Sequence, residues 1–161
     1  MSSGATPLQV GPGEGLVIAN PVGGTITFKV RGDQSAGSLT VFESEIPPGA
    51  GPPFHVHTNE DEGWYALEGD LRVRLGDEVR PAPAGTFFFA PRGVGHCFQN
   101  VGESPARVLV LFAPAGMDGF FERYAPQAGE EDPEIFRTIG AGAGMEVVGP
   151  PLAQSHPRAP A

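Results

Sequence analysis

The chain has very little cysteine, little positive charge and no long apolar run. Its single cysteine, Cys97, excludes an internal disulfide within the 161 residues. Lys and Arg number 10 against 19 Asp and Glu, and the resulting formal charge of −9 repels phosphate backbones and anionic lipids. No apolar run is long enough to cross a bilayer, and residues 1–15 lack a signal-peptide pattern. We therefore expect a cytoplasmic protein with no nucleic-acid or membrane partner.

Glycine and proline, in contrast, are abundant. The chain has 24 Gly and 18 Pro, a content that is also typical of disordered segments. However, 40% of the residues are hydrophobic, including 11 Phe, which is enough apolar surface to offset the entropy of the unfolded chain. Many turns combined with a large apolar fraction are typical of short strands in an all-β sandwich or barrel.

Strand-like runs recur from residue 16 to residue 112. They cover residues 16–19, 25–30, 39–46, 54–57, 63–67, 71–75, 86–90, 96–101 and 107–112. No helical pattern lies between them, which argues against a parallel α/β fold. We expect these runs to form a double-sheet β-barrel over residues 16–114, since such a barrel leaves few open sheet edges.

The remaining segments differ in character from the barrel. Residues 1–15 are rich in Gly and Pro and are expected to be flexible. Residues 115–149 are predicted to form a short helical extension, with one helix near 117–124 and another that begins after Asp132, the predicted N-cap, with Pro133 at its first position. Residues 150–161 form a Pro- and Ala-rich tail that is expected to be disordered.

Three of the four histidines and one glutamate form a candidate metal site. His55 and His57 are two positions apart, so on a strand their side chains point to the same face. Glu62 follows a short turn and is expected to open the antiparallel return strand, while His96 begins a later strand. Imidazoles with a carboxylate suit Mn, Fe, Co, Ni, Cu or Zn, and the lack of thiolates argues against structural zinc.

Other interpretations of these residues remain open on the sequence. The histidines could be unrelated polar residues at strand ends. Glu62 could belong to a solvated acidic run with Glu60 and Asp61. We expect Glu60 and Asp61 to be solvated turn residues, with Asp61 as the alternative ligand.

Two runs of fixed spacing contain these candidate ligands. In the first, five residues separate Gly49 from His55-x-His57, four residues precede Glu62, and six more precede Gly69. Glycine suits both ends because each lies at a predicted turn, where the backbone has to bend sharply.

The second run surrounds the remaining histidine. Five residues separate Gly85 from Pro91-x-Gly93, two residues precede His96, and three more precede Asn100. Both runs resemble, without a departure, the two motifs of the cupin superfamily. This resemblance implies a cupin double-sheet β-barrel of the jelly-roll type, and it implies a homodimer that pairs through its sheets.

Residues 55–69 are most similar to single-domain bacterial cupins related to flavonol (quercetin) dioxygenases, in which a helical C-terminal extension is usual. That resemblance implies one divalent transition metal (Fe, Mn, Ni or Co, with Zn or Cu possible), held by His55, His57, Glu62 and His96. It also implies that Glu62 is the catalytic base and that O₂ reacts with a small aromatic or flavonol-like substrate. The alternatives are a non-redox cyclase, isomerase or lyase, and a small-molecule-binding cupin without turnover.

Strand parity indicates which neighbouring residues face the metal. Trp64 and Ala66 share the parity of the carboxylate ligand, and Phe98 and Asn100 share that of the last histidine. We expect these four to face the barrel interior as substrate-pocket residues, although core packing explains Trp64 and Phe98 equally well. Cys97 has the opposite parity and is expected to be a small buried hydrophobe that points away from the metal.

Overall fold

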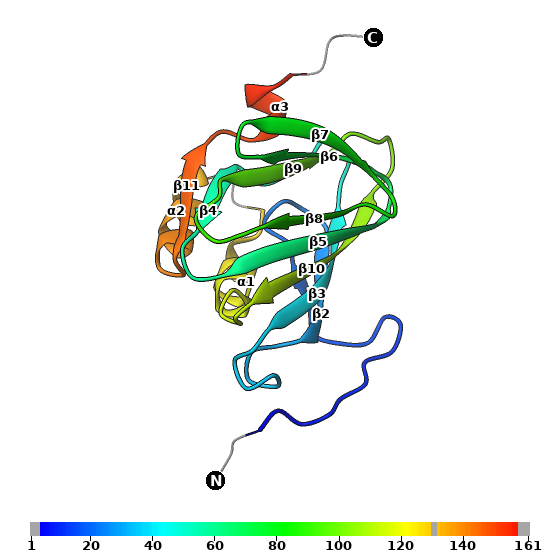
Figure 1. The fold of residues 1–161 in the computed structure, drawn as a ribbon, viewed down its shortest axis with the longest axis vertical. Coiled ribbons are helices and arrows are strands. Elements are labelled where there is room, and N and C mark those ends of the chain that lie inside the picture. The colour runs from blue at the N-terminus through cyan, green and yellow to red at the C-terminus, as the bar shows by residue number, and fades with distance from the viewer. Residues whose placement is uncertain (1–3, 130–131, 158–161) are drawn as a thin grey trace.

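The computed structural model describes residues 4–129 and 132–157, which fold into two antiparallel sheets that face each other (Figure 1). The larger sheet has the strand order β1-β2-β3-β10-β5-β8 and the smaller one the order β11-β4-β9-β6-β7. The strands are β1 (Val17–Ala19), β2 (Thr25–Val30), β3 (Thr40–Ile46), β4 (Phe54–His57), β5 (Asp61–Glu68), β6 (Asp70–Leu75), β7 (Glu78–Pro83), β8 (Phe87–Ala90), β9 (His96–Asn100), β10 (Ala106–Ala113) and β11 (Met145–Gly149). The all-β, jelly-roll expectation is confirmed.

Alternating burial along the strands creates the core between the sheets. On β10, Val108, Val110 and Phe112 are buried while the residues between them are partly exposed. Val110 lies opposite Phe42 on β3 and opposite Trp64 on β5, so the central strands of the larger sheet present one continuous apolar face. This two-residue periodicity is the pattern that half-buried strands require.

Two strands were missing from the sequence-based prediction, and β7 is the first. It contains Pro81 and Pro83, which usually argue against a strand because proline donates no backbone hydrogen bond. The strand order resolves this conflict, because β7 pairs only with β6 and lies at the edge of the smaller sheet.

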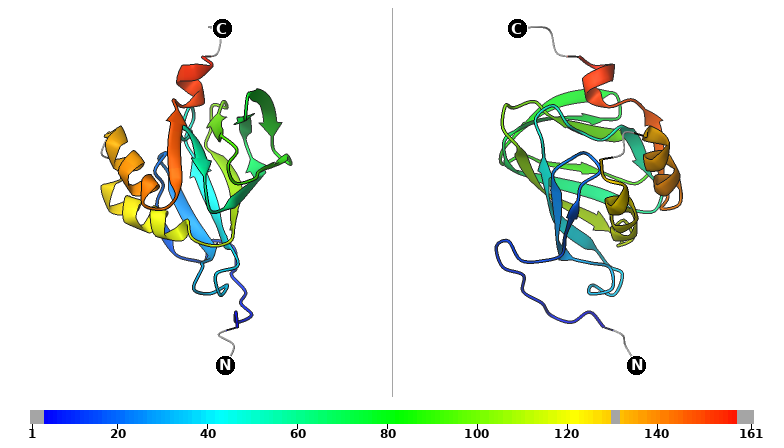
Figure 2. Two further views of the ribbon diagram at one scale, coloured as in Figure 1. Left: turned by 60° about the vertical axis from the view of Figure 1, so that its left-hand side comes forward. Right: turned by 180° about the vertical axis from the view of Figure 1, so that it is seen from behind.

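The second missing strand, β11, lies inside the predicted helical extension. The expected helices are present as α1 (Asp118–Tyr124) and α2 (Pro133–Ala141), and the Asp132 side chain caps α2 by accepting a hydrogen bond from the Glu134 N–H at 2.9 Å. A short 3₁₀ turn at Ala125–Gln127 follows α1. The chain then returns as β11 and pairs antiparallel with β4. Figure 2 shows α1 and α2 together on one side of the sheets.

The structure also differs from the prediction at the C-terminal tail. Residues 150–161 were expected to be disordered, yet α3 (Leu152–Ser155) is a short helix whose Leu152 side chain is fully buried. Arg72 donates hydrogen bonds to the carbonyl oxygens of Leu152 and His156 at 3.2 and 2.6 Å, which holds this segment on the smaller sheet. Residues 158–161 lie outside the described part of the chain.

The N-terminal segment expected to be flexible falls on residues 4–15 of the described chain and on residues 1–3, which lie outside it. Residues 4–15 contain neither helix nor strand. Lys29 on β2 contacts this segment, because its ammonium donates hydrogen bonds to the carbonyl oxygens of Gly11 and Glu14 at 3.2 and 3.0 Å. Among the described residues, no helix has the length and apolar character needed to cross a membrane.

Two glycines allow the cost of a positive φ to be separated from the cost of a steric clash. Gly69 (φ +91°) and Gly85 (φ +89°) have nearly the same φ, but a Cβ at Gly69 would lie 2.7 Å from the Ala106 Cβ, whereas nothing lies within 4 Å at Gly85. We expect Gly85→Ala to lower the free energy of unfolding by about 1 kcal/mol through backbone strain, and Gly69→Ala by about 2 kcal/mol more through overpacking. Urea unfolding measures both values, and equal losses would contradict the steric explanation.

Candidate metal centre

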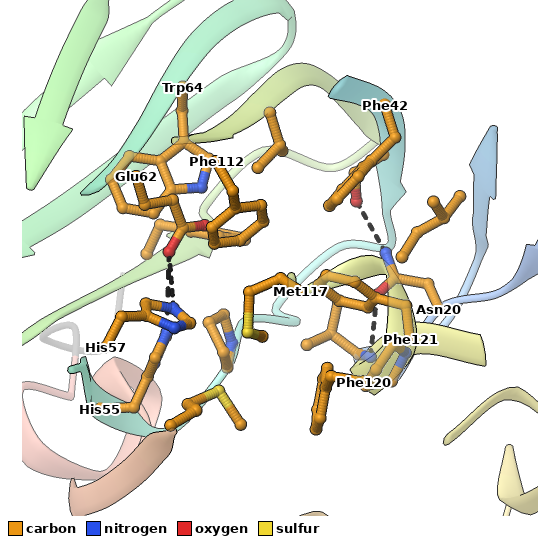
Figure 3. A pocket seen from close by; sticks show the side chains of 18 of the residues that line it. Asn20, Phe42, His55, His57, Glu62, Trp64, Phe112, Met117, Phe120 and Phe121 are labelled. Carbon is orange, nitrogen blue, oxygen red and sulfur yellow. Dashed lines mark hydrogen bonds and ion pairs between the residues drawn. The ribbon is translucent and has the colours of Figure 1, made fainter. Parts of the chain in front are cut away.

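The candidate ligands come from both sheets and meet in the barrel interior. His55 and His57 lie on β4 and His96 on β9, where His55 and His96 are directly paired across the two strands. Glu62 lies on β5, which belongs to the other sheet and pairs with β8 and β10. The expected antiparallel return of β5 along β4 is therefore wrong, because the turn at residues 58–60 carries the chain from one sheet to the other. Crossing between the sheets lets the carboxylate face the imidazoles (Figure 3).

The four side chains converge on the Glu62 carboxylate. Its Oε2 lies 2.9 Å from His57 Nε2, 3.0 Å from His96 Nε2 and 4.0 Å from His55 Nε2. One ligand atom from each residue lies within 4.8 Å of the others, and all four residues are at most 5% exposed. The interpretation of Glu62 as a solvated acidic residue is therefore excluded, and the cluster is a buried site of three histidines and one glutamate.

The hydrogen bonds behind two of the rings prepare them to bind a cation. His55 Nδ1 lies 2.7 Å from the Pro53 carbonyl oxygen, and His96 Nδ1 lies 2.9 Å from that of Val94. A carbonyl only accepts, so each Nδ1 carries a proton, and each Nε2 is directed at the cluster, where a metal ion would bind its lone pair. Donors bound at about 2.1 Å to one ion lie about 3 Å apart when adjacent and about 4 Å apart when opposite, which fits the three distances to Glu62.

The charges in the cluster also match those of a metal site. Burial lowers the pKa of His55 well below 6.5, and the neighbouring His96 and His57 lower it further. Burial alone would raise the pKa of Glu62, but hydrogen bonds and attraction from His57 and His96 outweigh it and bring the pKa to about 2. At neutral pH the cluster therefore holds a neutral His55 beside an ionised carboxylate, the protonation states that metal binding requires.

The two acidic residues before Glu62 have different surroundings. Asp61 accepts hydrogen bonds from the Arg92 guanidinium at 3.1 Å, which lowers the pKa of its carboxyl to about 2, and this pairing at the surface excludes it as the alternative ligand. Glu60, expected to be solvated, is instead only 3% exposed, and burial raises the pKa of its carboxyl. The expectation for Glu60 is therefore wrong.

A mainly apolar pocket opens beside the metal cluster. It is lined by His55, His57 and Glu62 on one side and by Met117, Phe120 and Phe121 of the C-terminal extension on the other (Figure 3). Seven aromatic side chains contribute to its walls: Phe42, Trp64, Phe98, Phe112, Phe120, Phe121 and Phe136. The site thus combines a cation-binding cluster with walls that suit a flat, apolar molecule.

The four predicted pocket residues divide into two pairs. Trp64 and Phe98 line the pocket, while Ala66 and Asn100 are buried but are not among its lining residues. The Asn100 side chain donates to the carbonyl oxygens of Ile46 and Ser104 and accepts from the Gly102 N–H, so it stabilises the loop after β9.

Sequence reasoning missed the contribution of the C-terminal extension to this pocket. The helical spacing of Met117, Phe120 and Phe121 did predict α1, but not that these side chains would line the pocket beside the metal cluster. It also missed the polar pair opposite, where Asn20 Nδ2 donates to Ser44 Oγ at 2.7 Å. Trp64 is the remaining polar wall residue, and its buried indole N–H has no hydrogen-bond partner in the described part of the chain.

Cys97 behaves as predicted. It is 1% exposed, and its thiol is not part of the ligand cluster found among the described residues. Burial raises the pKa of this thiol to about 11, so it is an unreactive apolar side chain rather than a ligand or nucleophile.

The barrel resembles known proteins in sequence and in fold. Residues 42–112 match the family model described as the cupin domain. The match covers 71 of the 161 residues and relates this region to cupin domains. In addition, the crystal structure of an RmlC-like cupin from Shewanella frigidimarina has a TM-score of 0.60 and 19% sequence identity, covering 73% of this chain and 98% of that chain. At this identity the likeness shows the shared cupin fold alone.

Two curated relatives resemble the same region. The tetracenomycin polyketide synthase protein TcmJ from Streptomyces glaucescens is 38% identical over 71 residues, which are 44% of this chain and 47% of that protein. Germin-like protein 1-1 from Oryza sativa subsp. japonica is 33% identical over 102 residues, which are 58% of this chain and 47% of that protein. The chain thus spans about half the length of these relatives. Neither is named as a flavonol dioxygenase.

The metal-free protein is expected to lose stability as the pH falls. Glu62 stays ionised in the folded protein down to about pH 2, whereas in the unfolded chain it takes up a proton near pH 4.5. The pKa of His55 is likewise lower in the folded protein than in the unfolded chain, where this side chain binds a proton below pH 6.5. Because the unfolded state binds more protons, the free energy of unfolding falls below pH 6.5, and the Glu62 contribution, about 3 kcal/mol, is lost between pH 4.5 and 2.

Urea unfolding of chelator-treated protein between pH 7 and pH 3 measures this dependence. Glu62→Gln should flatten the curve below pH 4.5, while Glu103→Gln, which removes an exposed carboxylate, should leave its shape as in the wild type. A wild-type curve that is level from pH 7 to pH 3 would contradict the charges assigned to the cluster.

Proposed function

We propose that this protein is a metal-dependent dioxygenase that cleaves a small aromatic or flavonol-like substrate with O₂. The observation that carries the proposal is the position of the three-histidine, one-glutamate cluster at the wall of an aromatic pocket. Four protein donors would leave positions open on a metal that prefers five or six ligands, and three of these donors, His55, His57 and Glu62, line the pocket. The aromatic walls beside this cluster favour a flat substrate with an oxygen donor.

The metal would be held by His55, His57, Glu62 and His96. Mn, Fe, Co, Ni, Cu and Zn all accept such donors, so metal availability rather than affinity selects among them. When bound, the metal supplies Lewis acidity and, if it is redox-active, one-electron chemistry toward dioxygen.

The pocket residues would bind and orient the substrate. The aromatic walls, among them Phe112 and Phe121, exclude water and would contact the apolar surface of the substrate. The unpaired indole N–H of Trp64 offers a hydrogen bond to an oxygen of the substrate. Glu62 is ionised at neutral pH and would accept the hydroxyl proton; its low pKa makes it a weak base, so the hydroxyl has to be acidic, as in an enol or phenol.

A non-redox cyclase, isomerase or lyase is the second candidate function. The similarity to TcmJ favours it, since that relative is named as a polyketide synthase protein. In this alternative the same site polarises an oxygen of the substrate without consuming O₂. A cupin that binds a small molecule without turnover would use the same pocket but release its ligand unchanged.

Oxygen consumption separates these functions. We expect the protein loaded separately with Fe(II), Mn(II), Co(II), Ni(II) or Zn(II) to consume O₂ on addition of a flavonol only with a redox-capable metal. Uptake should match substrate loss, and His96→Ala should abolish it by removing a ligand. His156→Ala, which changes an exposed histidine in the C-terminal segment, is the matched control. Turnover of the substrate without O₂ would select the second candidate, and tight binding without turnover the third.

We also propose that the chain forms a homodimer, as the cupin resemblance implies. An aromatic face on the outside of the larger sheet supports this proposal. It consists of Tyr65, Phe87 and Phe89, which are 42, 55 and 49% exposed. Tyr65 and Phe87 are paired across β5 and β8, and β8 is an edge strand, so the exposed rings lie together beside a free backbone edge. A second copy of the chain presents the same apolar face and would cover both the exposed rings and the free edge of β8.

The double variant Phe87→Ser, Phe89→Ser tests the dimer. Light scattering after size exclusion should give twice the 16.8 kDa chain mass for the wild type and the single-chain mass for the variant. Val148→Ser, which changes an exposed apolar residue on the smaller sheet, should stay dimeric. A monomeric wild type would remove the proposal, and a dimeric double variant would move the interface to another face.

A further inference from the structure

The three imidazoles of the metal centre are not held in the same way. The Nδ1 atoms of His55 and His96 each have a backbone carbonyl oxygen within 2.9 Å. His57 Nδ1 is buried as well, but it has no hydrogen-bond partner among the residues that the structure describes. When Nε2 binds a metal, Nδ1 carries the ring proton, and a buried N–H without a partner is costly, so this position calls for an acceptor.

The group that faces His57 Nδ1 is the carboxylate of Glu60. Its Oε2 lies 3.9 Å from Nδ1, about 1 Å beyond hydrogen-bond distance, and this oxygen is also buried without a partner within the described chain. Two complementary polar atoms thus lie on opposite sides of a short gap. The Glu60 carboxylate is kept out of solvent, whereas the neighbouring Asp61 lies at the surface with Arg92.

The backbone between β10 and α1 leaves room for the Glu60 carboxylate. A Cβ at Gly116 would lie 2.7 Å from Glu60 Oε1, so the glycine leaves space that any other residue would fill. Gly116 follows β10 and precedes α1. Glu60 is therefore enclosed by the C-terminal extension on one side and by the ligand strand on the other.

We propose that Glu60 is the positioning residue for His57. It accepts a hydrogen bond from the His57 Nδ1–H, and this bond fixes the tautomer whose Nε2 lone pair points to Glu62 and the metal. The gap closes by a small rotation of the Glu60 side chain. A carboxylate behind a ligand imidazole also makes the ring a stronger donor, and loss of such a partner lowers metal affinity about 10- to 100-fold. This inference depends on the metal site but not on the proposed dioxygenase activity.

The test compares Glu60→Gln with Asp61→Asn in the full chain. Both variants remove one negative charge from adjacent positions, but only the first changes the group behind His57. Zn(II) affinity, measured by competition with a chromophoric chelator, should fall about 10- to 100-fold in Glu60→Gln and by less than about threefold in Asp61→Asn. Equal losses in both variants would assign the effect to net charge and overturn the proposal.

Nuclear magnetic resonance of the ¹⁵N-histidine-labelled, Zn(II)-loaded protein separates positioning from a purely structural role. The wild type should show a strongly downfield Nδ1 proton for His57, which Glu60→Gln shifts upfield or loses. The Nδ1 protons of His55 and His96 should stay where they are. An unchanged His57 signal, unchanged affinity of Glu60→Gln, or a wild type that does not bind Zn(II) would each overturn the proposal.

Discussion

The metal centre depends on one contact between strands, the direct pairing of His55 on β4 with His96 on β9. Strand pairing brings opposite side chains to within about 5 Å on the same face, so residues 41 positions apart in the chain become neighbours without any help from their own chemistry. His57 joins them because it is two residues along β4, and Glu62 approaches from the facing sheet. A shift in the β4–β9 register by one residue would turn one of the two paired rings out of the barrel.

The C-terminal extension encloses the side of the metal centre that the barrel leaves open. β11 pairs with β4 so that Val147 lies opposite His55 and Met145 opposite His57, which covers the otherwise free edge of the strand that carries two ligands. The same segment supplies Phe120, Phe121 and Phe136 to the pocket wall. The barrel alone would therefore leave the centre open on one side. The extension gives it an apolar enclosure and gives Glu60 its buried position.

The sequence predicted the parts of the molecule that depend on local spacing. The ligands could be predicted because their motifs fix both strand parity and turn position, and α2 because Asp132 and Pro133 form a strong helix start. Facts that depend on distant packing could not be predicted. The prolines of β7 are acceptable only because that strand is at an edge, and β11 is a strand only because β4 offers it a partner. Nothing local distinguishes the buried Glu60 from the surface residue Asp61. The side chain of Glu60 packs against Gly116, and that of Asp61 pairs with Arg92, and both partners are distant in the sequence.

Parity also failed where facing the interior was equated with lining the pocket. Ala66 and Asn100 do face inward, but the interior is larger than the pocket and packs Asn100 into a loop contact. Trp64 is different, because its ring lies with centroids 5.0 Å from both His96 and Phe88. It is the only tryptophan in the sequence. The tryptophan fluorescence of this protein therefore comes entirely from the wall of the metal centre, so the unmodified chain carries its own optical reporter of what enters that site.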